Sequence, residues 1–237
     1  MQRKSKPDFL VGGEADLYLM GRRHRHFGDP MLYLSIEQLI GLASVHTTND
    51  ISYLPQPNQV SVVISDMVAP PDVNPTAFIL AFTENGDVVL TDNVKRGPEA
   101  CGGHRDPILD EDGITVIRME TAAEAAEREG GEEAGVILKS IQPLGMFRSI
   151  TGAKKPEGYR YPHPWSTQQF FMGIVDRFDL SLVKRNECHG PVIVKPEDAE
   201  RFLGAREFVL YKHAMATLFP DLAAEHGFVE NAETPHP

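Results

Sequence analysis

The sequence predicts an α+β fold built on a central sheet, and three features indicate it. The runs Val60 to Asp66 and Thr76 to Thr83 are rich in β-branched and aromatic residues, which favour strands. The segment Glu84 to Asp87 contains an Asn-Gly pair typical of hairpin turns, so it should return the chain as a further strand over residues 88–91. The alanine-rich segment from Thr121 to Gly135 carries the start and stop signals of one helix.

The composition indicates a globular chain and excludes several classes of partner. A hydrophobic share of 41% is enough for a real core. The net charge of −11 argues against a long nucleic acid as partner, because such binding relies on Lys and Arg at phosphates; a small phosphorylated ligand remains compatible. Cys101 and Cys188 make neither a disulfide framework nor a zinc pattern, and no signal peptide or membrane span is recognisable. We therefore expect a cytoplasmic protein that binds no membrane.

The first 58 residues are expected to form an N-terminal extension of uncertain structure. Apolar residues favour strands over 15–20 and 31–34. Ser35 and Gln38 form a capping box that should open a short helix running to Ala43. The basic run over 22–26 could contact phosphate, but such runs are more often solvated, and we favour a solvated loop.

The helix from Thr121 to Gly135 has legible ends. Thr121 and Glu124 form a capping box, and Gly135 stands where a left-handed C-terminal residue is favoured. Glu124 and Arg128 are four residues apart, a spacing at which opposite charges pair. The interior Gly130-Gly131 pair costs about 1 kcal/mol per glycine relative to alanine, so packing or a close approach must offset it.

Three acidic side chains of this helix share one face. Glu129, Glu132 and Glu133 are three and four residues apart, and side chains at those spacings are neighbours. Like charges destabilise the helix unless something neutralises them. A divalent cation would do so, because carboxylate oxygens suit hard ions such as Mg2+ or Mn2+.

The residues around these glutamates resemble the signature of the Nudix hydrolase family. That signature is a glycine, five residues, Glu, seven residues, then Arg-Glu-apolar-x-Glu-Glu-x-Gly-apolar. The match holds from Glu120 through Val136, except that Gly130 stands where the family has an apolar residue. Upstream, Arg96-Gly97 and the segment 101–106 are similar to the family's Arg-Gly and Gly-Gly segments. Counted from Gly103, the first glutamate would fall at 109 rather than 120, which indicates an insertion of 120 − 109 = 11 residues.

The resemblance implies a Nudix-type α/β/α sandwich with a mixed central β-sheet, plus the N-terminal extension. We expect the extension at 1–58, the Nudix hydrolase domain at 59–227 and a flexible tail at 228–237. The implied function is metal-dependent hydrolysis of a pyrophosphate bond in a nucleoside diphosphate linked to another moiety. The alternative is a non-catalytic Nudix-like protein that binds a nucleotide as a sensor or scaffold, and the irregular signature motivates it.

By the same resemblance, the catalytic residues are Arg128, Glu129, Glu132 and Glu133. The three glutamates would bind Mg2+ or Mn2+, and Arg128 would orient a carboxylate, most plainly by a bidentate contact. The general base remains open between Glu133 itself and a carboxylate of a later loop, Glu157 or Glu187.

Substrate contacts are expected from two segments. Arg96 offers a cation, and Gly102 and Gly103 offer bare backbone amides, both suited to a diphosphate. Tyr161 and Trp165, beside Arg160, could stack a nucleobase, although such rings more often close the rim of a core, which we favour. The partner would be a small nucleotide-type substrate, and a homodimer is compatible with the sequence.

The insertion and the C-terminal half complete the prediction. Residues 108–119 contain a turn at 110–113 and an apolar stretch at 114–119; they could shield the substrate or extend the sheet edge, and we favour the edge. Strands are expected at 136–142 and 145–150, on either side of Pro143, and at 168–175. Helices are expected over 196–203 and 205–218.

Overall fold

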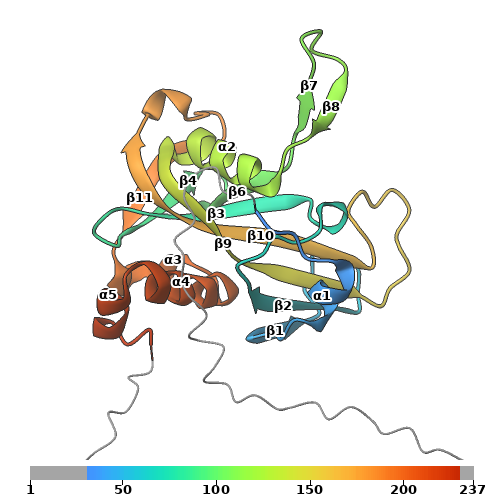
Figure 1. Ribbon diagram of the computed structural model, residues 1–237, viewed down its shortest axis with the longest axis horizontal. Coiled ribbons are helices and arrows are strands. Elements are labelled where there is room, and N and C mark those ends of the chain that lie inside the picture. The colour runs from blue at the N-terminus through green and yellow to red at the C-terminus, as the bar shows by residue number, and fades with distance from the viewer. Residues whose placement is uncertain (1–30, 230–237) are drawn as a thin grey trace, which may run out of the picture.

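The computed structural model describes residues 31–229, which fold into a sheet with helices on both faces (Figure 1). The α+β sandwich with a mixed central sheet is therefore confirmed. The predicted strand at 15–20, the basic run at 22–26 and most of the predicted tail lie outside the described residues. The division into extension, domain and tail stays a prediction.

The main sheet of the described residues is mixed. Its strand order is β1-β2-β9-β10-β3-β4-β11, with β5 added beside β4 and β6 beside β3. Only the β10–β3 pair is parallel among these pairings. The bounds are β1 (His46–Asn49), β2 (Asn58–Ile64), β3 (Thr76–Phe82), β4 (Val88–Asn93), β5 (Gly97–Glu99), β6 (Cys101–His104), β9 (Val136–Thr151), β10 (Trp165–Phe178) and β11 (Cys188–Val194).

Helices cover both faces of the sheet, α2 on one and α3 to α5 on the other (Figure 1). Their bounds are α1 (Ile36–Gly41), α2 (Ala122–Ala134), α3 (Ala199–Phe202), α4 (Ala205–Leu218) and α5 (Pro220–Glu225). Short 3-10 turns occupy Pro71–Val73, Leu180–Leu182 and Pro196–Asp198. Within the described part of the chain, no helix is both long and apolar enough to cross a bilayer.

The period of two along β3 divides the core between the two faces. Ile79 is buried on the α2 side, where Ala125 and Ala126 of the helix pack. Leu80 and Phe82 face the other way, into a larger cluster with α4. The small alanine side chains thus let α2 lie close to the sheet.

Helix α2 has the predicted ends but a different ion pair. The Thr121 capping box is present, and Gly135 ends the helix with φ +65°. Glu124 pairs with Arg118 at 2.7 Å rather than with Arg128, so the expected pair within the helix is wrong. Gly130 is buried, and a Cβ there would lie 3.3 Å from Ile79 Cγ2, so a close approach to β3 accounts for this glycine.

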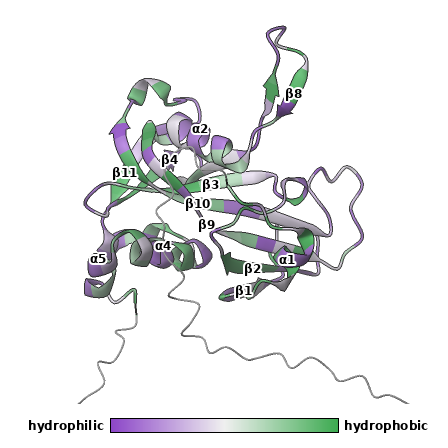
Figure 2. Cartoon of the chain, in the orientation of Figure 1, coloured by the Kyte–Doolittle hydropathy of each residue, from purple (hydrophilic) through white to green (hydrophobic). Residues whose placement is uncertain are grey.

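The insertion does not extend the sheet edge, contrary to our expectation. β7 (Pro107–Leu109) and β8 (Val116–Met119) pair only with each other, in a separate two-stranded sheet. The chain enters this hairpin from β6, which pairs with β3, and neither β7 nor β8 pairs with a strand of the main sheet. The hairpin projects beyond the start of α2 (Figure 1), and Figure 2 shows hydrophobic stretches on its strands. Ile117 of β8 is 61% exposed.

Strand β9 is continuous where two strands were expected. Pro143 pairs with Phe171 of β10, whereas β2 pairs only with residues 145–151, so among the described residues Pro143 has no strand on its other side. Proline has no backbone N–H to donate, and its loss is tolerated where no neighbouring strand needs that donor. The register shifts by one residue at Leu144, which is a bulge.

Other differences concern short elements. Residues 31–34 form no strand, only a single bridge between Tyr33 and Val68. The Ser35 capping box opens α1 as predicted, but the helix ends at Gly41. The predicted helix at 196–203 is a 3-10 turn followed by α3. Strands β1, β5, β6 and β11 and helix α5 were not predicted.

Candidate active site

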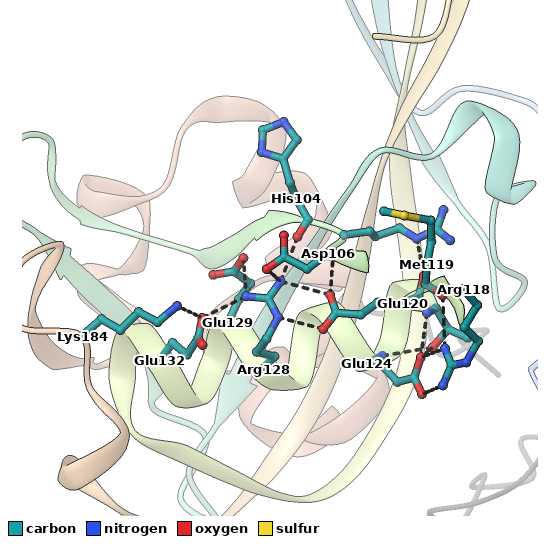
Figure 3. Close-up of polar contacts among 12 residues, drawn as sticks. His104, Asp106, Arg118, Met119, Glu120, Glu124, Arg128, Glu129, Glu132 and Lys184 are labelled. Atoms are coloured by element: carbon teal, nitrogen blue, oxygen red, sulfur yellow. Dashed lines mark hydrogen bonds and ion pairs between the residues drawn. The ribbon is translucent and has the colours of Figure 1, made fainter. Parts of the chain in front are cut away.

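Strand β6 lies beside helix α2, and the two are joined by polar contacts. The Gly102 amide donates to Glu133 Oε2 at 2.8 Å. Two residues further along the strand, the His104 carbonyl accepts from Arg128 Nη2 at 2.8 Å (Figure 3). The Gly-Gly segment and the acidic helix, separated in sequence by the insertion, therefore form one site.

The two glycines of β6 make this approach possible. A Cβ at Gly102 would lie 2.6 Å from the Ala77 carbonyl oxygen, closer than atoms can approach. A side chain at Gly103 would overlap the Glu129 carboxylate. Neither position leaves room for a larger residue without displacing its neighbour.

Arg128 lies at the centre of the acidic cluster (Figure 3). Its Nε and Nη2 donate to the two carboxylate oxygens of Glu120 at 2.8 and 3.1 Å, a bidentate contact. Nη1 lies 3.0 Å from Glu129 Oε1 and 2.9 Å from Glu132 Oε2, and Nη2 lies 3.6 Å from Asp106 Oδ2. The carboxylate that Arg128 orients is thus that of Glu120, whose residue is only 8% exposed.

Lys184 is a member of the cluster that sequence reasoning missed. Its Nζ lies 2.8 Å from Glu132 Oε2, and its backbone amide donates to the Glu132 carbonyl at 2.7 Å. It belongs to the segment between the 3-10 turn Leu180–Leu182 and β11. Nothing in the sequence around Lys184 indicates this contact, since a lone lysine in a loop is usually solvated.

Burial and charge shift the pKa values of the cluster in different directions. Burial alone would raise the pKa of Glu120, but hydrogen bonds from Arg128 and the Asp106 amide lower it overall. The hydrogen bond to Glu120 raises the pKa of Arg128. Burial raises the pKa of Glu129, and it raises the pKa of Glu133 to about 7, where the Gly102 amide opposes the shift and the Glu129 charge adds to it.

The three glutamates offer oxygen ligands of the kind that hard divalent cations prefer. Glu129 and Glu133 are desolvated acids with raised pKa values, so a nearby cation would stabilise their charged forms. Glu132 is already bound by Arg128 and Lys184. Over residues 31–229, no three His, Cys, Asp or Glu side chains converge to hold one ion, so binding would require side-chain rearrangement.

A cleft of about 770 Å³ lies beside the glycine pair. Gly102, Gly103 and His104 of β6 line it, together with residues of β3, β9 and β10. Thr76 also lines it, and the Thr76 hydroxyl is buried without a hydrogen-bond partner among the described residues. The cleft has the size of a small-molecule site.

Four of the five proposed substrate residues line this cleft. Gly102, Gly103 and Arg96 are among them, but Arg96 already makes a bidentate contact with Glu99 and the Gly102 amide is taken by Glu133. The fifth, Trp165, is not part of the lining. It opens β10, where the cleft-facing side chains are those of Ser166 and Gln168.

Tyr161 faces the cleft through a ring stack. It lies against the imidazole of His104, with ring centroids 5.6 Å apart and planes inclined by 22°, and Tyr159 meets it edge to face. The His104–Tyr161 pair also lines an outer cavity of about 450 Å³. Sequence reasoning named Tyr161 but missed His104, although it is in the matched Gly-Gly segment.

The candidates for general base lie in different settings. Glu133 is in the cluster, and burial raises its pKa to about 7. Glu157 is exposed in the loop between β9 and β10, and Glu187 is exposed in the turn before β11, where its amide donates to the Lys184 carbonyl at 2.9 Å. Glu187 therefore lies on the side of Lys184 and Glu132.

Comparisons with known proteins agree with the resemblance seen in the sequence. The NUDIX domain family model matches residues 73–213, more than half of the chain. The comparison of this chain with curated proteins found no match. Among solved structures, the chain is similar to a mutant of the Bacillus subtilis pyrophosphohydrolase BsRppH, with 19% identity, TM-score 0.48 and coverage of 78% of this chain and 100% of that one. It is also similar to a NUDIX hydrolase from Nitrosomonas europaea, with 16% identity, TM-score 0.33 and coverage of 54% and 75%. Both structural resemblances are distant.

Proposed function

Because this chain belongs to the Nudix family and is a Nudix-type pyrophosphohydrolase, we propose that it acts on a nucleoside diphosphate linked to another moiety and requires Mg2+ or Mn2+. The observation that carries this proposal is the arrangement of three helix carboxylates beside a glycine pair that borders a cleft. We also propose that it works in the cytoplasm, which two free, buried cysteines suit. A homodimer stays a prediction.

The residues divide the chemistry among them. Glu129, Glu132 and Glu133 would hold the cation, which, when bound, lowers the pKa of the attacking water and polarises phosphate oxygens. Arg128 holds Glu120 in place and offsets the charge of Glu129 and Glu132. We favour Glu133 as the proton acceptor because it lies in the cluster beside the Gly102 amide. Its pKa of about 7 belongs to the metal-free protein, and a bound cation would lower it.

The cleft would position the substrate. Tyr161 and His104 present a stacked ring pair for a nucleobase, and the Thr76 hydroxyl offers a buried polar contact. Arg96 would have to exchange its bond to Glu99 for a phosphate oxygen. Trp165 lies outside the cleft lining, so we expect Tyr161 rather than Trp165 to affect the choice of substrate.

The test is cleavage of the pyrophosphate bond in ADP-ribose, dinucleoside polyphosphates, coenzyme A, NADH and oxidised nucleoside triphosphates, with and without Mn2+, measured by chromatography of the two products. Replacing Glu132 and Glu133 together by Gln should lower the Mn2+-dependent rate by about 10³-fold or more, because cation binding and proton transfer are both lost. Circular dichroism should show an unchanged fold.

The matched control is Glu127→Gln, which removes the same charge from the same helix. Glu127 makes no ion pair within residues 31–229, so the variant should keep its activity. Full activity of the double variant, or no cleavage of any compound with Mn2+, would contradict the proposal; the second result would leave nucleotide binding without hydrolysis.

A further inference from the structure

A second cavity adjoins the cleft on the side of α3 and α4. It has a volume of about 360 Å³ and shares five lining residues with the cleft, namely Tyr53, Phe78, Glu99, Ala100 and Gln168. Because the lining is shared, a ligand that fills the cleft can extend into the second cavity. The distal part of this cavity is lined by aromatic residues and by the first turn of α4.

The walls of the second cavity are largely aromatic. Phe147, Phe170 and Phe202 line it together with Phe78. Phe78 and Phe170 are stacked with ring centroids 4.9 Å apart, and Phe147 lies 4.6 Å from Phe170. Such a surface accepts the flat or apolar body of a ligand and excludes water from the polar groups beside it.

Arg206 is the polar group that these walls surround. Its guanidinium carbon lies 5.1 Å from the centre of the Phe147 ring, and its Nη2 donates to the Tyr53 hydroxyl at 3.4 Å. Nη1 is buried and has no hydrogen-bond partner among the described residues, and Arg206 makes no ion pair within the same range. A buried donor without an acceptor is costly, and an oxyanion would satisfy it.

The acidic residues of this cavity do not take that role. The Glu99 carboxylate is held by Arg96. Glu207 folds back over Gly204 at the start of α4, away from pairing with Arg206. The Tyr53 hydroxyl accepts from Arg206 Nη2, so its own proton is free to donate to a ligand in the cavity.

We propose that this adjoining cavity binds the moiety attached to the nucleoside diphosphate, and that Arg206 and Tyr53 select a moiety ending in an oxyanion. The inference rests on the substrate class proposed above. The oxyanion is a carboxylate or a phosphate, since both match two converging donors. The aromatic walls hold the part of the moiety that precedes it.

The test measures binding by calorimetry in the absence of divalent cation, so that it needs no turnover. Two pairs of probes differ only at the terminal group: UDP-glucuronate against UDP-glucose for a carboxylate, and ADP-ribose 1″-phosphate against ADP-ribose for a phosphate. The acid-bearing member of one pair should bind about tenfold more tightly or better, as a charge-assisted hydrogen bond predicts. The pair that shows the preference identifies the group.

Arg206→Gln should bring that ratio close to one, and Tyr53→Phe should lower it several-fold. Arg201→Gln is the matched control, because Arg201 is an exposed arginine on α3 that lies outside the cavity lining, so this variant should keep the ratio. If Arg206→Gln does not fold, Tyr53→Phe decides, since Tyr53 is 64% exposed.

Equal affinities in both pairs, or a preference that survives Arg206→Gln and Tyr53→Phe, would overturn the inference. Failure of the proposed function has a different signature. In that case the oxyanion preference would be present in binding, while no diphosphate would be cleaved with Mn2+.

Discussion

The Gly102 amide and the charge of Glu129 both act on the Glu133 carboxylate, and together with burial they determine its pKa. The carboxylate accepts from Gly102 at 2.8 Å, and the sulfur of Cys188 lies 3.9 Å from its other oxygen. Burial and the Glu129 charge hold its pKa at about 7, well above the ordinary 4.5 of a glutamate. The folded protein therefore retains a proton at Glu133 that the unfolded chain has already released.

The stability of the metal-free protein should reflect that proton. Between pH 4.5 and 7 the folded state binds more protons at Glu133 than the unfolded state, so stability falls as pH rises through this range. Glu133→Gln should make the decrease in the free energy of unfolding over this pH range smaller by about 2 kcal/mol, a value that allows for partial exposure of the side chain. Urea unfolding at pH 5 and pH 8 in EDTA measures it.

Glu111→Gln is the control, because Glu111 is exposed at the tip of the insertion hairpin. It should keep the pH dependence of the natural chain. If Glu133→Gln keeps it as well, the raised pKa is assigned to the wrong residue.

Single residues differed in how far the sequence could place them. The spacing of Glu129, Glu132 and Glu133 follows from the helix period, so their common face was predictable. Lys184 was not, because its contact with Glu132 depends on how the segment before β11 returns to α2. Arg96 is a cation suited to a diphosphate, but its side chain is bound to Glu99. Trp165 is a ring suited to stacking, but side chains alternate along β10 and Trp165 is not part of the cleft lining.

At the scale of elements, α2 was the most predictable part of the chain because its capping box and terminal glycine are local signals. Strands β6 and β11 carried no such signal. Their sequences include glycine and proline, which do not favour strands. β6 forms by pairing with β3 and β11 by pairing with β4, and both partners are distant in sequence. The insertion likewise folds as a hairpin of its own, with β7 pairing only with β8.

The two interior glycines of α2 should respond differently to alanine. At Gly131 a Cβ would lie 3.6 Å from Leu182 Cδ1, an ordinary contact, so Gly131→Ala should stabilise the protein by about 0.5–1 kcal/mol through helix propensity. At Gly130 the contact with Ile79 would be 3.3 Å, so Gly130→Ala should gain less or lose stability. Thermal and urea unfolding of both variants measure the difference.

The comparison of these two variants is its own control, since both change glycine to alanine in the same helix. A Gly130→Ala variant more stable than Gly131→Ala would contradict the close approach of α2 to β3. It would also mean that this position could hold the apolar residue that the family signature carries.

Over the whole molecule, two helical layers on a mixed sheet bring the acidic helix, the glycine strand and the cleft to one place. The resemblance to the Nudix signature implied the layers, and the strand runs and the capped helix were recognisable from local signals. It did not predict the cleft or the adjoining cavity, because both are made by residues from distant segments. With a net charge of −11, the chain as a whole also favours an approaching cation.

The central claim is that the carboxylates of Glu129, Glu132 and Glu133 bind a divalent cation beside the cleft. A crystal structure grown with Mn2+ and recorded for anomalous scattering tests it most directly. We expect the manganese signal within bonding distance of oxygens of these residues, with Glu132 released from Lys184. A manganese signal elsewhere, or glutamates still bound to Arg128 and Lys184 at saturating Mn2+, would contradict the claim.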